Sequence, residues 1–264
     1  MKNVFSKLAQ ATKNMARTTA LAVARAAHAA TSAENDAPLV NERKMVADGV
    51  NFEAARAALD SFCLPDGEFP EGDISSVYFD TPDLAFLAEK ENGDNLKSKV
   101  RLRWYDGGSG EIPAFLEIKL RVGAARDKFR FRIRADAETL ASAPLDGGVF
   151  PALLAEAARG WGELGAAVPP GLMPVLCVSY KRRRYVCPFT GSRVALDSGI
   201  HSGRRSAAFF ATPEERLDAP EVVCEFKNNT LEMPPWLRAL QGNGFRLRSF
   251  SKYGRLAAYA RDGF

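Results

Sequence analysis

Three short segments in the middle of the chain carry a charged residue at every second position. Because side chains at positions i and i+2 of a β-strand share a face, each segment predicts a strand with one charged and one apolar face. Clustered guanidinium and ammonium groups bind phosphate oxygens through charge-assisted hydrogen bonds. The segments therefore predict a site for a multivalent anion. Its charged residues are Lys97, Lys99, Arg101 and Arg103, then Glu117, Lys119 and Arg121, then Lys128, Arg130, Arg132 and Arg134.

The alternation alone would also fit an antiparallel sheet with one face in water. The charge balance of residues 97–134 favours the anion site instead. Eleven Lys and Arg residues stand there against four acidic residues, a local charge of +7 in a chain whose net charge is +4. Like charges directly opposite each other destabilise a sheet. We therefore expect a bound polyanion to neutralise these strands.

A Glu-x-Lys pattern recurs on three predicted strands that lie far apart in the chain. The three copies are Glu42/Lys44, Glu117/Lys119 and Glu225/Lys227. Carboxylate oxygens are suitable ligands for Mg²⁺ or Mn²⁺, so Glu42, Glu117 and Glu225 are candidate metal ligands. A salt bridge between neighbouring strands is the alternative interpretation of each pair. For Glu225 we favour the metal.

Short strands that alternate with helices must position these groups. Besides the three basic strands, the periodicity predicts strands at 76–79, 175–186, 193–197 and 221–227. Helices are predicted at 51–62, with Phe52, Ala55, Leu59 and Phe62 on one face, and at 81–89, 150–161, 236–240 and 251–260. Thr81 is the predicted cap of the second helix, and Ser251 lies where the last helix can begin. A helix N-terminus at Ser251 would favour a phosphate.

The first 33 residues differ from the rest, because they carry five Lys or Arg residues and no acid. They predict a basic helix or arm, which could serve as an organelle-targeting peptide or lie on a membrane surface. No stretch of the sequence approaches the about 18 consecutive apolar residues of a membrane-spanning helix. We expect an arm at residues 1–38 and one domain at residues 39–264.

Cysteine and histidine are too few to support common metal or acid–base chemistry. The four cysteines include no C-x-x-C pair, so neither a disulfide framework nor a zinc site is expected. Only His28 and His201 are present, and histidine-based chemistry is not expected. A reducing cytoplasm fits this composition best.

Several sequence blocks resemble, in order, those of the VTC (vacuolar transporter chaperone) domain, a polyphosphate-polymerase domain of the CYTH-like triphosphate tunnel enzymes. The resemblance covers about residues 39–259. The first blocks are Asn41-Glu-Arg-Lys-Met, Ser76-Val-Tyr-Phe-Asp-Thr-Pro-Asp, Lys99-Val-Arg-Leu-Arg-Trp-Tyr and Phe115-Leu-Glu-Ile-Lys. The later ones are Val178-Ser-Tyr-Lys-Arg, Ser192-Arg-Val-Ala-Leu-Asp, Val223-Cys-Glu-Phe-Lys and Phe250-Ser-Lys-Tyr.

This resemblance implies an α+β fold, a closed eight-stranded antiparallel β-barrel with flanking helices, and an ATP-dependent polyphosphate polymerase that uses Mn²⁺ or Mg²⁺. Together with the strand pattern it assigns three groups of site residues. The candidate catalytic residues are Lys44, Arg101, Arg103, Lys119, Lys128 and Lys252. The candidate substrate-binding residues are Arg130, Arg182, Arg193, Lys227 and Ser251, and Glu225 matches the metal-binding glutamate of the family.

Two other functions use the same features. The wider superfamily begins with Glu-x-Glu-x-Lys, whereas this chain has Val40 at the first position, which argues against a triphosphate or nucleoside-triphosphate hydrolase. A non-enzymatic polyphosphate-binding module is the third interpretation. Nucleic acid is not expected, because single-strand binders stack bases on aromatic rings beside the basic groove, and Phe129 and Phe131 face away from the cations. We expect the chain to bind ATP and polyphosphate, or another triphosphate.

Overall fold

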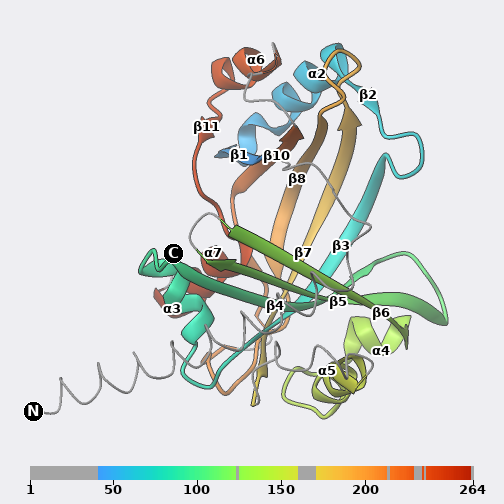
Figure 1. The fold of residues 1–264 in the computed structure, drawn as a ribbon, viewed down its shortest axis with the longest axis vertical. Coiled ribbons are helices and arrows are strands. Elements are labelled where there is room, and N and C mark those ends of the chain that lie inside the picture. Colours follow the sequence, from blue (N-terminus) through green and yellow to red (C-terminus); the bar gives the residue numbers. More distant parts are fainter. Residues whose placement is uncertain are drawn as a thin grey trace, which may run out of the picture.

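One large antiparallel sheet organises the chain in the computed structural model, which describes residues 41–122, 125–159, 171–212, 215–228, 234 and 236–262 (Figure 1). The strands follow the order β11-β1-β10-β8-β7-β3-β4-β5-β6, with β2 paired to β7 and β9 paired to β8. Their bounds are β1 (Asn41–Asp48), β2 (Leu64–Pro65), β3 (Glu71–Asp80), β4 (Leu96–Tyr105), β5 (Glu111–Val122), β6 (Ala125–Asp136), β7 (Met173–Val186), β8 (Arg193–Ser202), β9 (Leu217–Asp218), β10 (Glu221–Asn228) and β11 (Arg246–Leu247).

Helices flank the sheet at three places. α2 and α6 lie together at one end of the molecule, α4 and α5 lie beside β6 near the other, and α7 lies where the chain ends (Figure 1). The bounds are a 3-10 turn η1 (Gly49–Asn51), α2 (Phe52–Phe62), α3 (Ala85–Glu91), α4 (Ala137–Ser142), α5 (Val149–Arg159), α6 (Trp236–Gly242) and α7 (Lys252–Asp262). None of the described helices is long and apolar enough to cross a membrane.

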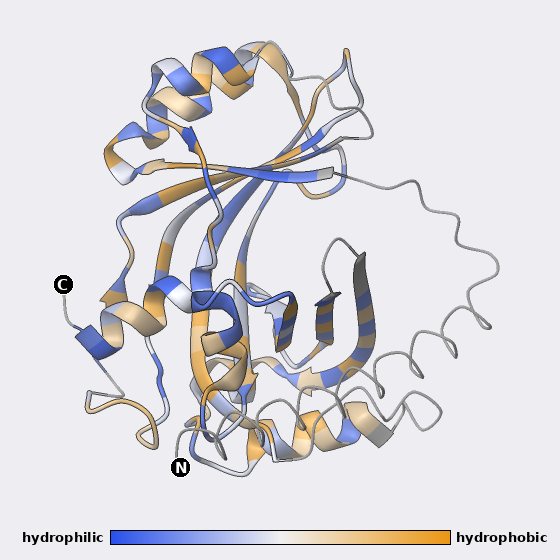
Figure 2. Ribbon diagram, turned by 60° about the vertical axis from the view of Figure 1, so that its left-hand side comes forward, coloured by the Kyte–Doolittle hydropathy of each residue, from blue (hydrophilic) through white to orange (hydrophobic). Residues whose placement is uncertain are grey.

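The apolar faces of the basic strands form part of the core. Leu102, Leu116, Ile118 and Phe129 are buried in a cluster that also contains Phe150 of α5. Figure 2 shows the corresponding bands of hydrophilic and hydrophobic residues along the strands. The predicted two-residue alternation is therefore confirmed, and the apolar face is buried beneath helices while the charged face lies on the other side of the sheet.

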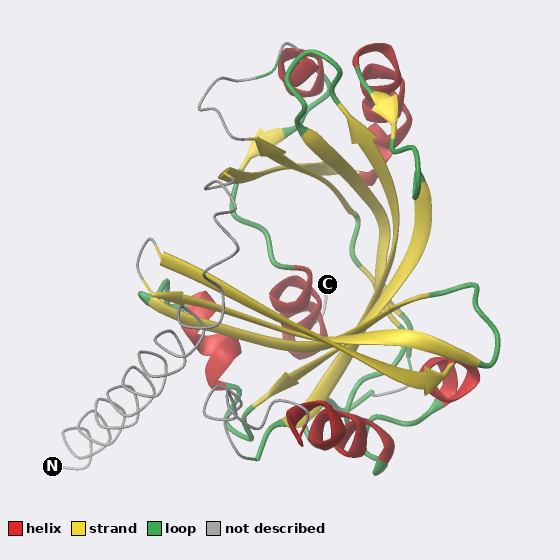
Figure 3. Ribbon diagram, turned by 45° about the vertical axis from the view of Figure 1, so that its right-hand side comes forward, coloured by secondary structure: helices red, strands yellow, loops and turns green. Residues whose placement is uncertain are grey.

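The expected closed eight-stranded barrel is wrong. The sheet has eleven strands and is open, since among the described residues no backbone ladder joins its edge strands β6 and β11. The sheet curls strongly, so that its two halves face each other with α7 between them (Figure 3). The alternation determines which face is charged but not whether the edges meet, because closure depends on strand tilt and stagger. Cations such as Lys128 on β6 and Lys227 on β10 also disfavour a close approach of the two halves.

Most predicted elements are present with shifted bounds. The three basic strands are β4, β5 and β6, and they are neighbours in the sheet. The second predicted helix begins at Ala85 rather than Thr81, because Leu84 adopts a left-handed conformation (φ 52°) and residues 81–84 form a turn. Thr81 Oγ1 still accepts a hydrogen bond from the Ala85 N–H. Phe62, predicted on the buried face of α2, is 39% exposed.

The predicted arm at residues 1–38 lies outside the described residues. So do Val40, which stands where the wider superfamily has Glu, and the end of the helix predicted at 150–161.

Candidate functional site

Strand register brings charged residues of different strands next to one another. Across β4, β5 and β6, Lys99 is opposite Lys119, which is opposite Lys128. Two pairs further along, and therefore on the same face, Arg101 is opposite Glu117. In the other half of the sheet, Lys44 of β1 is opposite Glu225 of β10. Residues far apart in the sequence are thus brought to one surface.

An inner cavity of about 250 Å³ is lined by residues from both halves of the sheet and from the start of α7. Most of the candidate residues line it. They are Lys44, Arg101, Arg103, Lys119, Lys128, Arg182, Arg193, Glu225, Lys227, Ser251 and Lys252. The exceptions are Glu42, Glu117 and Arg130, none of which lines this cavity. The strands and α7 therefore form one strongly cationic compartment.

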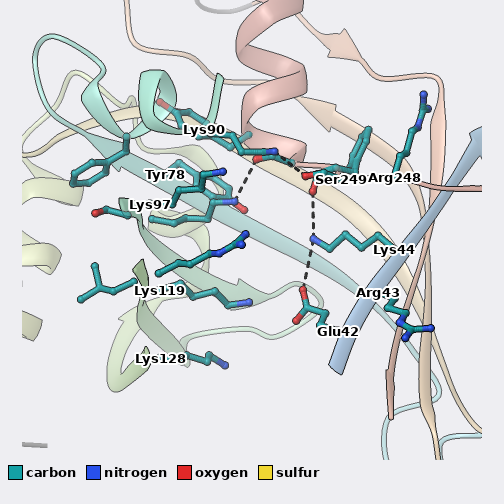
Figure 4. A pocket seen from close by; sticks show the side chains of 18 of the residues that line it. Glu42, Arg43, Lys44, Tyr78, Lys90, Lys97, Lys119, Lys128, Arg248 and Ser249 are labelled. Carbon is teal, nitrogen blue, oxygen red and sulfur yellow. Dashed lines mark hydrogen bonds and ion pairs between the residues drawn. The ribbon is translucent and has the colours of Figure 1, made fainter. Parts of the chain in front are cut away.

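An outer cavity of about 640 Å³ adjoins the inner one. The two share lining residues from both halves of the sheet and from the residue before α7, namely Lys44, Tyr78, Lys99, Lys119, Lys128, Lys227 and Ser251. The outer cavity adds Glu42, Lys90, Lys97, Arg121 and Arg248. In Figure 4, Lys97, Lys119 and Lys128 point toward the space opposite Lys44 and Glu42. The two cavities form a continuous basic surface along which a linear anion can extend.

Arg101 is held by acceptors within the protein. Its Nε and Nη2 donate to Glu117 Oε2 at 2.9 and 2.5 Å, and its Nη1 donates to Tyr78 Oη at 3.0 Å. Glu117 is only 2% exposed and also lies 3.3 Å from Lys128 Nζ and 3.5 Å from Arg130 Nε. Burial alone would raise the pKa of Glu117, but the surrounding cations hold it well below its ordinary value. Glu117 is therefore an ionised counter-ion for the basic strands.

A second arginine–carboxylate pair lies in the other half of the sheet. Arg182 donates to Asp197 through Nε at 2.6 Å and Nη2 at 2.8 Å, and to Glu225 Oε2 at 3.0 Å. Lys252 Nζ donates to Asp197 Oδ2 at 2.6 Å and lies 4.4 Å from the centre of the Tyr180 ring. Asp197 is fully buried, and Arg182 and Lys252 lower its pKa despite the opposing effect of burial. This network holds Arg182 and the start of α7 together.

Lys99 and Lys119 differ from these arginines. No carboxylate of the described residues forms a salt bridge within 4.0 Å with either ammonium group. Lys99 Nζ donates to Ser251 Oγ at 3.3 Å. Burial lowers the pKa of both lysines to about 8, and Arg101 and Lys44 act in the same direction on each. A bound anion would relieve this repulsion, so the two lysines favour a negatively charged ligand.

Glu42 and Glu225 are the carboxylates best placed for a divalent cation. Lys44 Nζ lies 3.7 Å from Glu42 Oε1 and 3.9 Å from Glu225 Oε1, so one ammonium group bridges the two. Burial would raise the pKa of Glu225, but Lys44 and Arg182 contribute to keeping it well below its ordinary value. The described part of the chain contains no cluster of three metal-ligating side chains. Mg²⁺ commonly binds one or two carboxylates together with substrate phosphates, and this pair of oxygen donors fits that pattern.

Several site residues were not among the catalytic, substrate-binding or metal-binding candidates. Tyr78, Tyr180, Asp197 and Lys99 all contact the candidate residues. The sequence did point to these residues, because each lies within one of the blocks that resemble the VTC domain. Lys99 also lies on the predicted cationic face of its strand. Their roles depend on contacts between strands, and the alternation within one strand gives no information about such contacts.

The start of α7 is placed by buried contacts with β3. Tyr253 stacks on Tyr78 with ring centroids 5.0 Å apart, and its hydroxyl donates to Asp80 at 2.9 Å. Ser251 Oγ accepts a hydrogen bond from the Gly254 N–H at 3.3 Å, which is a helix-capping contact. The N-terminal end of α7 therefore lies at the inner cavity, where a phosphate is favoured.

A comparison with models of known families identifies the family of this chain. The sequence profile of the family described as "VTC domain" matches residues 22–260. One similar solved structure comes from Bacillus halodurans and is provisionally described as an adenylate cyclase, with 17% identity, a TM-score of 0.45, and coverage of 80% of this chain and 92% of the other. Another, from Vibrio parahaemolyticus and described in the same way, has 14% identity, a TM-score of 0.44 and coverage of 83% and 98%. The comparison with curated proteins found no match.

Proposed function

The chain belongs to the VTC domain family, and we propose that it is an ATP-dependent polyphosphate polymerase, which transfers the γ-phosphate of ATP to a polyphosphate chain. One observation carries the proposal. Lys99 and Lys119 lie half-buried without a carboxylate partner among the described residues, next to arginines that already have partners. Such a site suits a ligand with several adjacent negative charges.

The arrangement supports binding of a linear phosphate chain. We assign phosphate contacts to the candidate residues that line the inner cavity: Lys44, Arg101, Arg103, Lys119, Lys128 and Lys252, with Arg182, Arg193, Lys227 and Ser251. Arg130 lies outside both cavities, 3.8 Å from the centre of the Phe115 ring and close to Glu117, which supports a role in holding Glu117. The outer cavity provides room for the remainder of the chain or for the nucleotide.

Phosphoryl transfer suits this site because it requires mainly positioning and charge neutralisation. A terminal oxygen of the acceptor chain forms a new bond to the γ-phosphorus of ATP. The bond between that phosphorus and the β–γ bridging oxygen breaks, and its electron pair stays on ADP. The acceptor oxygen already carries negative charge, so no side-chain base is required. The lysines and arginines stabilise the charge that spreads over the transferred group.

We propose Mn²⁺ or Mg²⁺ as the cofactor, held by Glu225 with Glu42. A bound divalent cation would neutralise phosphate charge and align the reacting groups. Glu117 fits this task less well, because four cationic side chains lie within 4.0 Å of its carboxylate. We therefore propose that Glu117 serves as a counter-ion and not as a metal ligand.

We further propose that residues 39–264 form a single catalytic domain that acts in the cytoplasm. The four cysteine thiols are buried and unpaired, a state that a reducing compartment maintains.

A triphosphate hydrolase is a second candidate, favoured by the exposure of the cavity to water. Lys128 lines both cavities, yet its side chain is 49% exposed. Water could therefore replace the chain end as the acceptor of the phosphoryl group.

The test is incubation of the full chain with ATP and Mn²⁺, followed by measurement of long-chain polyphosphate and free phosphate. We expect long-chain polyphosphate, and we expect Lys119→Ala or Glu225→Ala to abolish it. Lys181→Ala is the matched control, because Lys181 is exposed, pairs with Glu71 and lines neither the inner nor the outer cavity. Release of free phosphate alone would reject the polymerase in favour of hydrolysis. Binding of polyphosphate without turnover would indicate a binding module.

A further inference from the structure

Tyr78 of β3 lies where the inner and outer cavities meet, since it lines both of them. The residue is only 4% exposed, and its hydroxyl group lies against Arg101, which lines the inner cavity. Tyr78 is placed between the two halves of the site, next to Arg101 and Lys99 of β4. A phosphate chain that extends from one cavity to the other would pass this hydroxyl group.

The Tyr78 ring is fixed in position by a buried network. Its face stacks on Tyr253 of α7 at a centroid distance of 5.0 Å and an interplanar angle of 5°. Tyr253 in turn donates to Asp80, whose carboxylate accepts the backbone N–H groups of Phe86 and Leu87 at 2.8 and 3.0 Å. Strand β3 and helices α3 and α7 therefore hold the hydroxyl group in one place before any ligand arrives.

Among the described residues, the Tyr78 hydroxyl has one hydrogen-bond partner, the guanidinium group of Arg101. A guanidinium group only donates, so Tyr78 Oη must accept the 3.0 Å hydrogen bond from Arg101 Nη1. The hydroxyl group can still donate its own proton, and among the described residues none accepts it. The charged and titratable groups next to it are Lys99, Arg101 and Arg103 of β4 and Tyr253 of α7. Lys44 of β1, Lys119 of β5 and Glu42 of β1 line the outer cavity with it. The three β4 cations offer only donors, and the Tyr253 hydroxyl donates to Asp80.

We propose that Tyr78 contacts the substrate, with its hydroxyl group donating a hydrogen bond to a phosphate oxygen at the junction of the two cavities. The inference rests on the proposed function, because it assigns a contact to the same phosphate substrate. It also implies that substrate binding requires the protonated form of Tyr78, since a phenolate at this position would repel the phosphate.

The electrostatic surroundings make this requirement measurable near neutral pH. Burial alone would raise the pKa of Tyr78, but Arg101, Lys99 and Arg103 outweigh burial and lower it to about 7. Above neutral pH the free protein therefore carries a phenolate beside Arg101. A bound phosphate takes over the neutralisation of these cations and raises the pKa of Tyr78, so that a proton is taken up on binding.

Tyrosinate absorbance in the ultraviolet tests the proposal directly. We expect the free protein at pH 8 to show a tyrosinate signal that disappears when tripolyphosphate is added. Tyr78→Phe should remove the signal while keeping the ring stacked on Tyr253. Tyr105→Phe is the control and should keep it, because Tyr105 lines neither cavity. A tyrosinate signal that tripolyphosphate does not change would overturn the proposal.

Binding and turnover provide a second test. A hydrogen bond to a charged group contributes about 1.5–3 kcal/mol, so Tyr78→Phe should weaken tripolyphosphate binding by about tenfold or more. Wild-type affinity in this variant, with unchanged kcat and KM for ATP, would refute the role of Tyr78 and leave the proposed function standing. Failure of the wild-type chain to bind tripolyphosphate would refute both.

Discussion

The arginines and the lysines of the site are both cationic, but they have different partners. Arg101 and Arg182 donate to the buried carboxylates of Glu117 and Asp197. Lys99 and Lys119 line the same inner cavity without a carboxylate partner in the described structure. A guanidinium fork binds a carboxylate through two hydrogen bonds and stays charged, while a lysine readily changes its pKa when buried. The comparison indicates that the arginine–carboxylate pairs maintain the shape of the site, and that the lysines provide its uncompensated charge.

The largest expected effect comes from removing a counter-ion of the arginines. Glu117→Gln should lower the free energy of unfolding by about 3–5 kcal/mol, because it leaves buried cations without a counter-charge. Chemical denaturation would measure this effect. Glu111→Gln is the matched control on the same strand, because its exposed ion pair with Arg134 should contribute less than about 1 kcal/mol. Equal effects of the two changes would show that Glu117 does not stabilise the fold through its charge.

Removing a lysine should have the opposite effect on stability. Lys119→Met deletes a half-buried charge that has no carboxylate partner within 4.0 Å among the described residues, so the unliganded protein should be as stable as the wild type or more stable. Its affinity for tripolyphosphate should fall by about tenfold or more, because a charge-assisted contact contributes about 1.5–3 kcal/mol. Thermal unfolding and calorimetric titration would test the two parts, with Lys181→Met as the control. Loss of stability together with intact binding would contradict the comparison.

The same lysines predict a pH dependence. Their pKa values of about 8 lie below the ordinary lysine value of 10.5, so both lose their charge as the pH rises through about 8. Affinity for tripolyphosphate should therefore fall between pH 7 and pH 9 at constant ionic strength. Between about 8 and 10.5 the unfolded chain binds more protons than the folded one, so these two groups make the unliganded fold more stable as the pH rises. Calorimetric titrations and unfolding curves across this range would measure both trends, and an affinity that rises with pH would contradict the expectation.

The smallest effect is expected at the exposed rim of the inner cavity. Arg193 lines this cavity but is exposed to water. Arg193→Ala should weaken tripolyphosphate binding by a factor of only about 2–5, and the difference should disappear in high salt because ions screen exposed charges. Titrations at low and high ionic strength would decide. A loss as large as that of Lys119→Met would show that Arg193 belongs to the inner group of cations.

Much of the local structure was predictable from the chain itself. The two-residue alternation correctly predicted β4, β5 and β6, and the apolar positions correctly predicted α2. The start of α3 was not predictable, because it depends on the left-handed backbone of Leu84 and on the contact of Asp80 with two N–H groups of the helix. The closed barrel was wrong for a similar reason, since closure depends on how distant strands approach each other.

The amino-acid sequence by itself determined which face of each strand is charged, because the period of a β-strand is two residues whatever its neighbours are. It also determined the excess of cations in residues 97–134. Only the tertiary structure decided which of those cations have a counter-ion. Arg182 and Lys252 reach Asp197 from 15 and 55 residues away, and such contacts form through strand register and the placement of α7. Lys99 and Lys119 remain without a carboxylate partner in the described structure for the same reason, and this makes them the proposed centre of the anion site.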